Sequence, residues 1–449
     1  MTVRPLLAGG GMNKTLSVLL WLAACTGSNP PQGDDSLVDI AGFSSEQRPL
    51  DLLLVIDDSA GMAAKQRALA ANLPALIAQL GGASDGLPDL HIGVISTDMG
   101  TSSTTSVPAT AIGQPGAGGC MATGKAGKLL VQPAAAGAMT ARYLAVPRTG
   151  APNFTGTLAE VLGEQVLLGE TGCGFEQPLA AIRAALHDPD NAGFLRDEAN
   201  LAVIVVSDED DCSARAATLF GPDSSSLGTL DSFRCFRFGV TCAPDDPMQL
   251  GPKTGCAPRE DSTLVDDVAG YRDELLAVKD GDARRVMFAT LAGPTSTVAV
   301  ELRPHPAGGS RIALAHGCAF GSPSGQLTAD PPVRLTALVG AFGINGSAQS
   351  ICSEDLASAE AELGAAARRL AGDRCLARAV PFGAACTVFE APEATPAQRT
   401  ELPACAAVGD TAPCYRVVED AACSAGQRLD IVRATAAAPG TWTSMQCRL

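Results

Sequence analysis

The chain has 449 residues, of which 46% are hydrophobic and 18% are charged, and its formal net charge is −16. This length exceeds one ordinary domain and predicts two folded regions besides an export segment. The composition excludes wholesale disorder, and the excess of acidic groups argues against nucleic acid as a partner because it repels phosphates.

The first predicted element is an export signal. Lys14 is followed by an apolar run over residues 16–24 that ends in small residues before Cys25, and the run is too short to span a bilayer. Residues 22–25 resemble the lipobox of bacterial lipoproteins, which implies cleavage before the cysteine and a lipid on Cys25. Residues 1–25 are therefore predicted to be a lipoprotein signal peptide; an ordinary signal in which Cys25 is incidental is the alternative.

This signal bears on the start, the location and the charge of the mature chain. Met12 gives a more compact signal than Met1. Because Thr26, and not an aspartate, follows the cysteine, the resemblance to lipoproteins implies the outer membrane or the cell surface. Cleavage removes Arg4 and Lys14, so the mature chain carries 30 basic and 48 acidic residues, a formal charge of −18. Such a balance suits divalent cations or basic partners, or serves solubility alone.

A tether and then an alternation of strands and helices are predicted next. Residues 26–47 are rich in Ser, Pro, Gly and Asp and lack hydrophobic periodicity, which predicts a flexible tether. Beyond it, continuous apolar runs predict buried strands, and apolar residues spaced by three or four predict helices. The predicted strands are residues 52–56, 90–96, 201–206 and 286–291, with edge strands near 129–131 and 143–146; the predicted helices lie around residues 69–80, 158–168, 175–186, 264–278 and 353–370.

The alternation covers residues 48–372 and predicts the fold class. Strands that alternate with helices form α/β folds with right-handed crossovers. We therefore expect a doubly wound, Rossmann-like, mostly parallel sheet. A small cysteine-rich domain is expected over residues 373–449, where only short strands, such as 415–418 and 429–432, are predicted.

Disulfides are predicted from the cysteines. The chain has 15 of them, but neither a CxxC pair nor a Cys/His cluster, which argues against a structural metal site. Without Cys25 an even number remains in each predicted domain, as separately cross-linked domains require, and such cross-links indicate export. The pairing stays open among Cys120, Cys173, Cys212, Cys235, Cys242, Cys256, Cys318 and Cys352 in the first domain, and among Cys375, Cys386, Cys405, Cys414, Cys423 and Cys447 in the second.

Acidic residues directly follow two of the predicted strands. Asp57, Asp58 and Ser59 come after residues 52–56, and residues 207–211 follow the later strand. In a doubly wound sheet, ligands bind beyond the carboxyl ends of the strands. Carboxylate and hydroxyl oxygens suit Mg²⁺ or another hard divalent cation. The sequence therefore predicts a cation site at this edge of the sheet.

These segments carry a family resemblance. Residues 52–62 resemble the first strand and the metal-ion-dependent adhesion motif of von Willebrand factor A domains, especially the cysteine-containing type of bacterial surface lipoproteins, and residues 203–210 resemble their later strand. The resemblance implies that Asp57 and Ser59 hold a metal in the first loop and Asp208 in the third. It also implies protein binding or adhesion, with no enzymatic activity, in which an acidic side chain of a partner completes the coordination of the metal.

The sequence departs from this motif in two places. Gly61 stands where the family has a second serine. In the middle loop, where the family has a threonine, either Cys173 or Thr171 takes that position, depending on the alignment. Water or Glu176 is expected to fill the gap, since Mg²⁺ commonly keeps several waters.

Three alternatives stay open from the sequence. Asp57 can be a turn residue at a helix start, with Ser59 bonding the first helical amides. The chain can be a structural envelope scaffold whose metal motif has decayed. A secreted serine hydrolase would use Ser59 with His305 or His316 as the base, although Asp57 stands where the nucleophile motif of that class has glycine.

Overall fold

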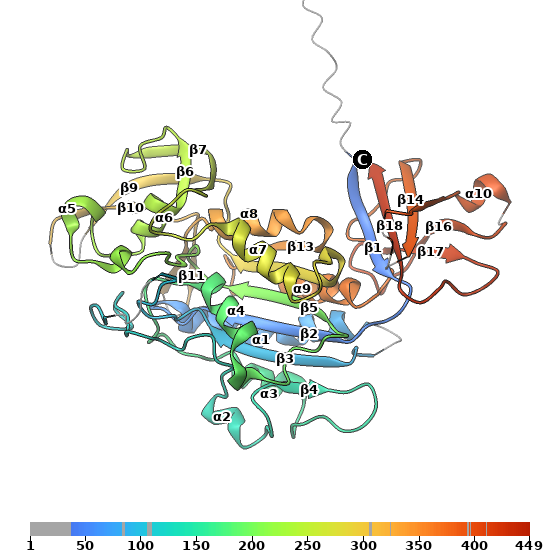
Figure 1. The fold of residues 1–449 in the computed structure, drawn as a ribbon, viewed down its shortest axis with the longest axis horizontal. Coiled ribbons are helices and arrows are strands. Elements are labelled where there is room, and N and C mark those ends of the chain that lie inside the picture. Colours follow the sequence, from blue (N-terminus) through green and yellow to red (C-terminus); the bar gives the residue numbers. More distant parts are fainter. Residues whose placement is uncertain are drawn as a thin grey trace, which may run out of the picture. The chain divides into compact units, whose positions relative to one another are not determined.

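The largest sheet has six strands in the order β13-β8-β5-β2-β3-β4 (Figure 1). The computed structural model describes residues 37–82, 86–105, 110–304, 308–323, 325–392, 395, 397–409 and 411–449. The predicted signal with Cys25 and the first part of the predicted tether lie outside these residues. The strands are β2 (Leu50–Ile56), β3 (Leu90–Ser96), β4 (Leu144–Val146), β5 (Asn200–Val206), β8 (Val286–Ala292) and β13 (Gly346–Ser350).

The central strands are parallel and fully buried. Leu54 of β2 pairs with Val94 of β3 and with Ile204 of β5, and both pairings are parallel. The strand β8 is parallel to β5, β13 is parallel to β8, and only β4 runs antiparallel to its neighbour. Because Ile56 and Val206 are also paired, the segments that follow these two strands emerge at the same edge of the sheet.

Helices cover both faces of this sheet. Successive side chains of a strand point to opposite faces, so Leu54 packs in one hydrophobic cluster and Val55 in another. The first cluster includes side chains from α1 (Met62–Gly81), α3 (Leu158–Gln165) and α9 (Ala357–Leu370). The second includes side chains from α4 (Pro178–His187), α7 (Val268–Ala277) and α8 (Val333–Ala341). Burial on both faces explains the continuous apolar runs of the strand sequences.

Most elements predicted in this region are confirmed. The four predicted buried strands coincide with β2, β3, β5 and β8, and a helix lies within or overlaps each predicted helical segment. Pro74 lies inside α1, which continues through it. Of the two predicted edge strands, residues 144–146 form β4, but residues 129–131 form no strand.

Unpredicted strands make the chain richer in β-structure than its sequence indicated. A four-stranded sheet has the order β10-β9-β7-β6, and β11 pairs with β12. The residues of these strands are largely exposed or half-buried, so they lack the apolar runs that mark the central sheet. Their bounds are β6 (Val240–Ala243), β7 (Gly251–Pro258), β9 (Val298–Pro304), β10 (Ser310–Leu314), β11 (Cys318–Ser322) and β12 (Gly325–Ala329).

The C-terminal strands form a separate sheet that includes an N-terminal strand. Its order is β1-β18-β14-β15, and a hairpin of β16 and β17 packs with it. The prediction of a flexible tether up to residue 47 is therefore wrong for residues 38–44, because Ile40 and Phe43 are buried in the core of this sheet. The strands are β1 (Val38–Ser44), β14 (Ala385–Pro392), β15 (Thr400–Leu402), β16 (Cys414–Glu419), β17 (Gln427–Val432) and β18 (Thr441–Arg448).

The remaining helices are short. They are α2 (Pro133–Ala136), α5 (Ser224–Leu227), α6 (Phe233–Gly239) and α10 (Cys405–Val408), with 3₁₀ turns at Pro189–Asn191, Ala217–Phe220, Ala283–Arg285 and Gly343–Asn345. Within the described ranges, no helix is both long and apolar enough to cross a membrane.

Seven disulfides cross-link the chain. They join Cys120 to Cys173, Cys212 to Cys235, Cys242 to Cys256, Cys318 to Cys352, Cys375 to Cys423, Cys386 to Cys447, and Cys405 to Cys414. The prediction that the cysteines form disulfides is confirmed, and no bridge joins a cysteine before residue 373 to one after it. This number of disulfides is consistent with an extracellular, oxidising environment.

Candidate functional site

Two loops meet at the carboxyl edge of the six-stranded sheet. The backbone N–H of Asp57, directly after β2, donates to the carbonyl of Val206 at the end of β5 over 2.9 Å. The hydroxyl of Ser207 donates to the Asp57 carboxylate over 2.7 Å. The structure thus joins two segments that lie 150 residues apart in the sequence.

Asp57 is wholly buried and has hydrogen-bond donors on both of its carboxylate oxygens. Its Oδ1 accepts the backbone N–H of Ser59 over 2.8 Å, and the Ser59 side chain is a further hydrogen-bond partner. Burial raises the pKa of Asp57 well above its ordinary value, and the neighbouring charge of Asp208 raises it further. The predicted ligands Asp57, Ser59 and Asp208 therefore lie in one neighbourhood. The N-terminal cap of α1 is Gly61 and not one of these residues.

Asp208 has a cation beside it that the sequence analysis missed. The ammonium of Lys65, from the first turns of α1, lies 2.5 Å from Asp208 Oδ2 and 3.4 Å from the carbonyl oxygen of Gly61. The two side chains of the ion pair are 2% and 12% exposed. Burial raises the pKa of Asp208, and the charge of Lys65 opposes this shift. Lys65 lies four residues after Gly61 on α1, which is the only hint of this contact in the sequence.

Gly61 faces Asp208, as the family motif implies for the second serine. A Cβ atom at this position would lie 3.9 Å from Asp208 Oδ2. The backbone of Gly61 has a φ of 98°, in the left-handed region that favours glycine. The local backbone therefore accounts for a glycine at this position.

The middle loop packs against the first loop but supplies no thiolate. Gly172 donates its N–H to the carbonyl of Asp58 over 2.7 Å. The suggestion that Cys173 is a metal ligand is wrong, because its sulfur is bonded to Cys120 and a disulfide sulfur is not a thiolate. Thr171, the other candidate at this position, is exposed.

Glu176 is the least satisfied acid of the site. Glu176 is 1% exposed, and neither of its carboxylate oxygens has a hydrogen-bond donor among the described residues. Burial raises the pKa of Glu176 well above its ordinary value, and the charges of Glu209 and Asp57 raise it further. Burial also raises the pKa of Glu209 to about 7, with Asp330 as the next cause.

The other acids near this edge have structural partners. Asp58 accepts the hydroxyl of Ser96 over 2.6 Å and pairs with Lys125. Asp211 and Arg334 form an ion pair of 2.9 Å whose side chains are both 0% exposed. Such pairs fix the loops and occupy the carboxylates of Asp58 and Asp211.

A pocket of about 90 Å³ opens next to Asp208. Its lining contains both acids and bases: His316 lies 2.5 Å from Asp330, and Arg311 pairs with Asp231, which is outside the lining. The lining residues are Asp208, Glu209, Asp210, Ser232, Phe233, Cys235, Phe236, Arg303, Arg311, Ala313, Leu314, His316, Thr328 and Asp330.

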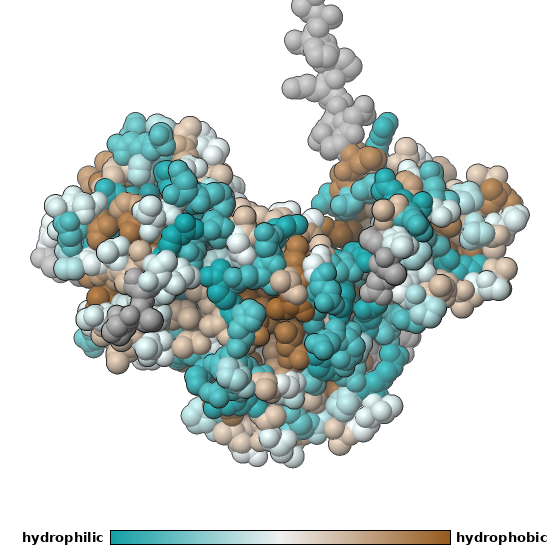
Figure 2. Space-filling model, viewed as in Figure 1, coloured by the Kyte–Doolittle hydropathy of each residue, from teal (hydrophilic) through white to brown (hydrophobic). Residues whose placement is uncertain are grey.

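A second hollow lies between α4 and α7. Hydrophobic side chains gather over these helices on the face shown in Figure 2, and the hollow itself is lined by residues such as Leu179, Ile182 and Leu275. Its volume is about 10 Å³, roughly the space of one water molecule. We therefore place the ligand site at the edge of the sheet and not here.

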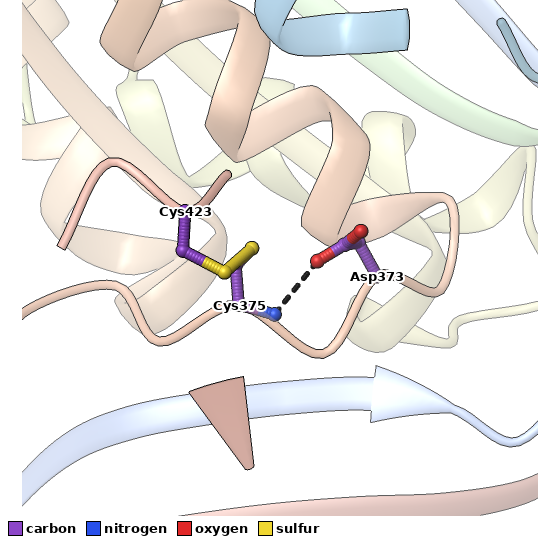
Figure 3. Close-up of side chains that lie close together, drawn as sticks. All are labelled: Asp373, Cys375 and Cys423. Atoms are coloured by element: carbon purple, nitrogen blue, oxygen red, sulfur yellow. Dashed lines mark hydrogen bonds between the residues drawn. A yellow bond between two sulfur atoms is a disulfide. The ribbon is translucent and has the colours of Figure 1, made fainter. Parts of the chain in front are cut away.

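The tightest cluster of potential metal ligands consists of other residues, in the C-terminal part of the chain (Figure 3). Among the described residues, Asp373, Cys375 and Cys423 form the one group of three acids, histidines or cysteines with ligand atoms within 4.8 Å of one another. Both sulfurs are joined in a disulfide, and Asp373 accepts the backbone N–H of Cys375 over 2.7 Å and pairs with Arg368. The oxidised cluster therefore offers a single, occupied carboxylate and does not suit a metal.

Comparison with known proteins adds no relative. No protein family model matches this sequence, and no curated protein is significantly similar to it. The function has to be argued from the motifs and from the contacts at the edge of the sheet.

Proposed function

We propose that this protein is a lipid-anchored binding protein of the bacterial cell envelope, held at the outer membrane or cell surface by a lipid on Cys25. Its binding domain is a doubly wound domain of the von Willebrand factor A type. The parallel strand order, with one antiparallel edge strand and helices on both faces, supports this fold. The disulfides support export.

The contact between Asp57 and Ser207 carries the proposal. It brings Asp57, Ser59 and Asp208 together at the carboxyl edge of the sheet, where ligands bind in folds of this class. Carboxylate and hydroxyl oxygens of this kind suit Mg²⁺ or another divalent cation. In our proposal, an acidic side chain of a partner protein completes the coordination of the cation.

Binding is favoured over catalysis by the surroundings of Ser59. Its side chain is hydrogen-bonded to Asp57, and a carboxylate beside a hydroxyl opposes the formation of an alkoxide. In the part of the chain that the structure describes, His91 contacts Phe194 and His316 contacts Asp330. Both histidines therefore have other partners, and His305, the other candidate base, lies outside the described residues.

A structural scaffold is the second candidate, and one observation favours it. The ammonium of Lys65 already neutralises Asp208, so this carboxylate is satisfied by the protein itself. A scaffold would keep the fold and the disulfides and would bind no cation at the edge of the sheet.

Calorimetric titration of the purified, oxidised protein with Mg²⁺, Ca²⁺ and Mn²⁺ separates the two candidates. We expect saturable binding of at least one cation, and weaker binding by Asp208→Ala, because this change leaves the charge of Lys65 uncompensated beside the site. The exposed Asp245 provides a matched control, and Asp245→Ala should bind like the wild type. Flat traces for the wild type with all three cations would favour the scaffold.

A further inference from the structure

The carboxylates of Glu176 and Glu209 form a pair with no positive partner in the described part of the chain. Glu176 is 1% exposed and both of its oxygens lack a donor. Glu209 is close enough for its charge to raise the pKa of Glu176, and it is itself bonded to Ser232. A buried charge without a partner is costly unless a cation or a proton compensates it.

The neighbouring acids differ from Glu176 because each has an ion-pair or hydrogen-bond partner. Lys65 pairs with Asp208, and His316 lies 2.5 Å from Asp330. Asp57 accepts hydrogen bonds from two serines. Of these described acids, Glu176 is therefore the one without a partner, and Glu209 beside it is bonded to a neutral hydroxyl.

Lys65 also makes the position beside Asp208 unfavourable for a metal. Its ammonium lies 2.5 Å from Asp208 Oδ2, and a divalent cation on the same oxygen would lie at about 2.0–2.6 Å from it. Two cations on one buried oxygen repel each other strongly, because the local dielectric constant is low. A metal at Asp208 would have to displace Lys65.

We propose that a hard divalent cation binds between the carboxylates of Glu176 and Glu209, while Lys65 holds Asp208. This inference rests on the proposed binding function and moves the cation away from the position that the family motif implies. Glu209 lines the pocket of about 90 Å³, which gives the cation a route to solvent and room for the waters that such ions retain.

The same pocket defines the chemistry of the ligand on the open side of the cation. Arg303, Arg311 and His316 line it, and the Nε of Arg311 is buried without an acceptor in the described structure. A carboxylate of a partner protein would meet the cation on one side and the Nε of Arg311 on the other. The ligand class is therefore an acidic side chain of a protein.

Mn²⁺ binding tests the position of the cation. It is measured from the loss of the electron paramagnetic resonance signal of free Mn²⁺. We expect Glu176→Gln and Glu209→Gln to weaken Mn²⁺ binding by about tenfold or more. The double variant Lys65→Met/Asp208→Asn removes the ion pair without changing the net charge of the pair. Its dissociation constant for Mn²⁺ should lie within about threefold of the wild-type value, because the ion pair does not contact the cation in this proposal.

The possible outcomes separate this inference from the proposed function. If the double variant loses Mn²⁺ and the two glutamine variants keep it, the cation is held by Asp208, so the inference fails and the proposed function stands. If the wild type binds no Mn²⁺, the inference fails, and the proposed function fails with it only if the calorimetric traces with Mg²⁺ and Ca²⁺ are flat as well. Thermal unfolding without metal controls for misfolding, since each glutamine variant should be at least as stable as the wild type once a repelling buried charge is removed.

Discussion

The six-stranded sheet and the C-terminal sheet are stabilised in different ways. In the first, β2, β5 and β8 are buried along their whole length, and helices add apolar side chains on both faces. In the second, strands with mixed burial enclose a much smaller hydrophobic cluster, and three disulfides cross-link it. The difference shows that a region that buries few apolar side chains needs covalent cross-links to hold its strands together.

Removing disulfides from the C-terminal sheet should give the largest difference in stability between the two regions. We expect replacement of Cys375, Cys423, Cys386 and Cys447 by alanine to unfold that sheet, because each disulfide contributes about 2–5 kcal/mol. Hydrogen exchange should then become fast in β14 and β18 and stay slow in β2 and β5. Alanine replacement of Cys242 and Cys256, which join only the β6–β7 hairpin, is the control. Equal loss of protection in both sheets would contradict the comparison.

Breaking a buried ion pair should be the next largest effect, and it should differ between the two regions. Arg334→Met leaves the buried carboxylate of Asp211 without its cation, which typically costs about 3–5 kcal/mol. The pair of Arg416 and Asp430 in the C-terminal hairpin is 53% and 24% exposed, so Arg416→Met should cost at most about 1 kcal/mol. Urea unfolding of the two variants measures both effects, and similar midpoints would refute the distinction.

Removing a buried carboxyl group that has no partner should stabilise the six-stranded region. Glu360 lies on the buried side of α9 with no hydrogen-bond donor among the described residues, and burial raises its pKa to about 9. The folded protein then holds a proton that the unfolded chain releases above about pH 4.5, so stability falls as the pH rises from 4.5 to 9. We expect Glu360→Met to raise the free energy of unfolding by about 2–4 kcal/mol at pH 7.5 and by little near pH 4.5.

Denaturant unfolding at several pH values measures this effect. The exposed Glu354 provides the control, because Glu354→Met removes the same charge from solvent. A gain in stability for Glu360→Met that does not change with pH would show that the effect comes from packing and not from the charge.

The central sheet could be predicted because its strands must be apolar on both faces. Continuous apolar runs such as residues 201–206 are the pattern that such strands leave in a sequence. The strands β7 and β11 left no such mark, since most of their residues are exposed or half-buried. The strand β1 was missed for another reason: its partner β18 lies about 400 residues later in the sequence.

The site could be predicted in part. Asp57 and Asp208 were placed at one edge because each directly follows a buried parallel strand. The Lys65 contact joins residues 143 positions apart, and no local pattern specifies it. The absence of a donor at Glu176 is a property of its surroundings, which the sequence does not contain. The bond between Cys173 and Cys120 was one of many pairings that eight cysteines allow.

The pairing of β1 with β18 determines how the molecule would bear a mechanical load. The two strands are antiparallel and are paired from Val38 with Cys447 to Ser44 with Trp442. A pull on the chain before Leu37 would therefore stretch a row of interstrand hydrogen bonds together, and the bond between Cys386 and Cys447 would pass the tension to β14. Under the anchoring that we propose, tension on the chain before Leu37 would reach this cross-linked sheet before the six-stranded sheet.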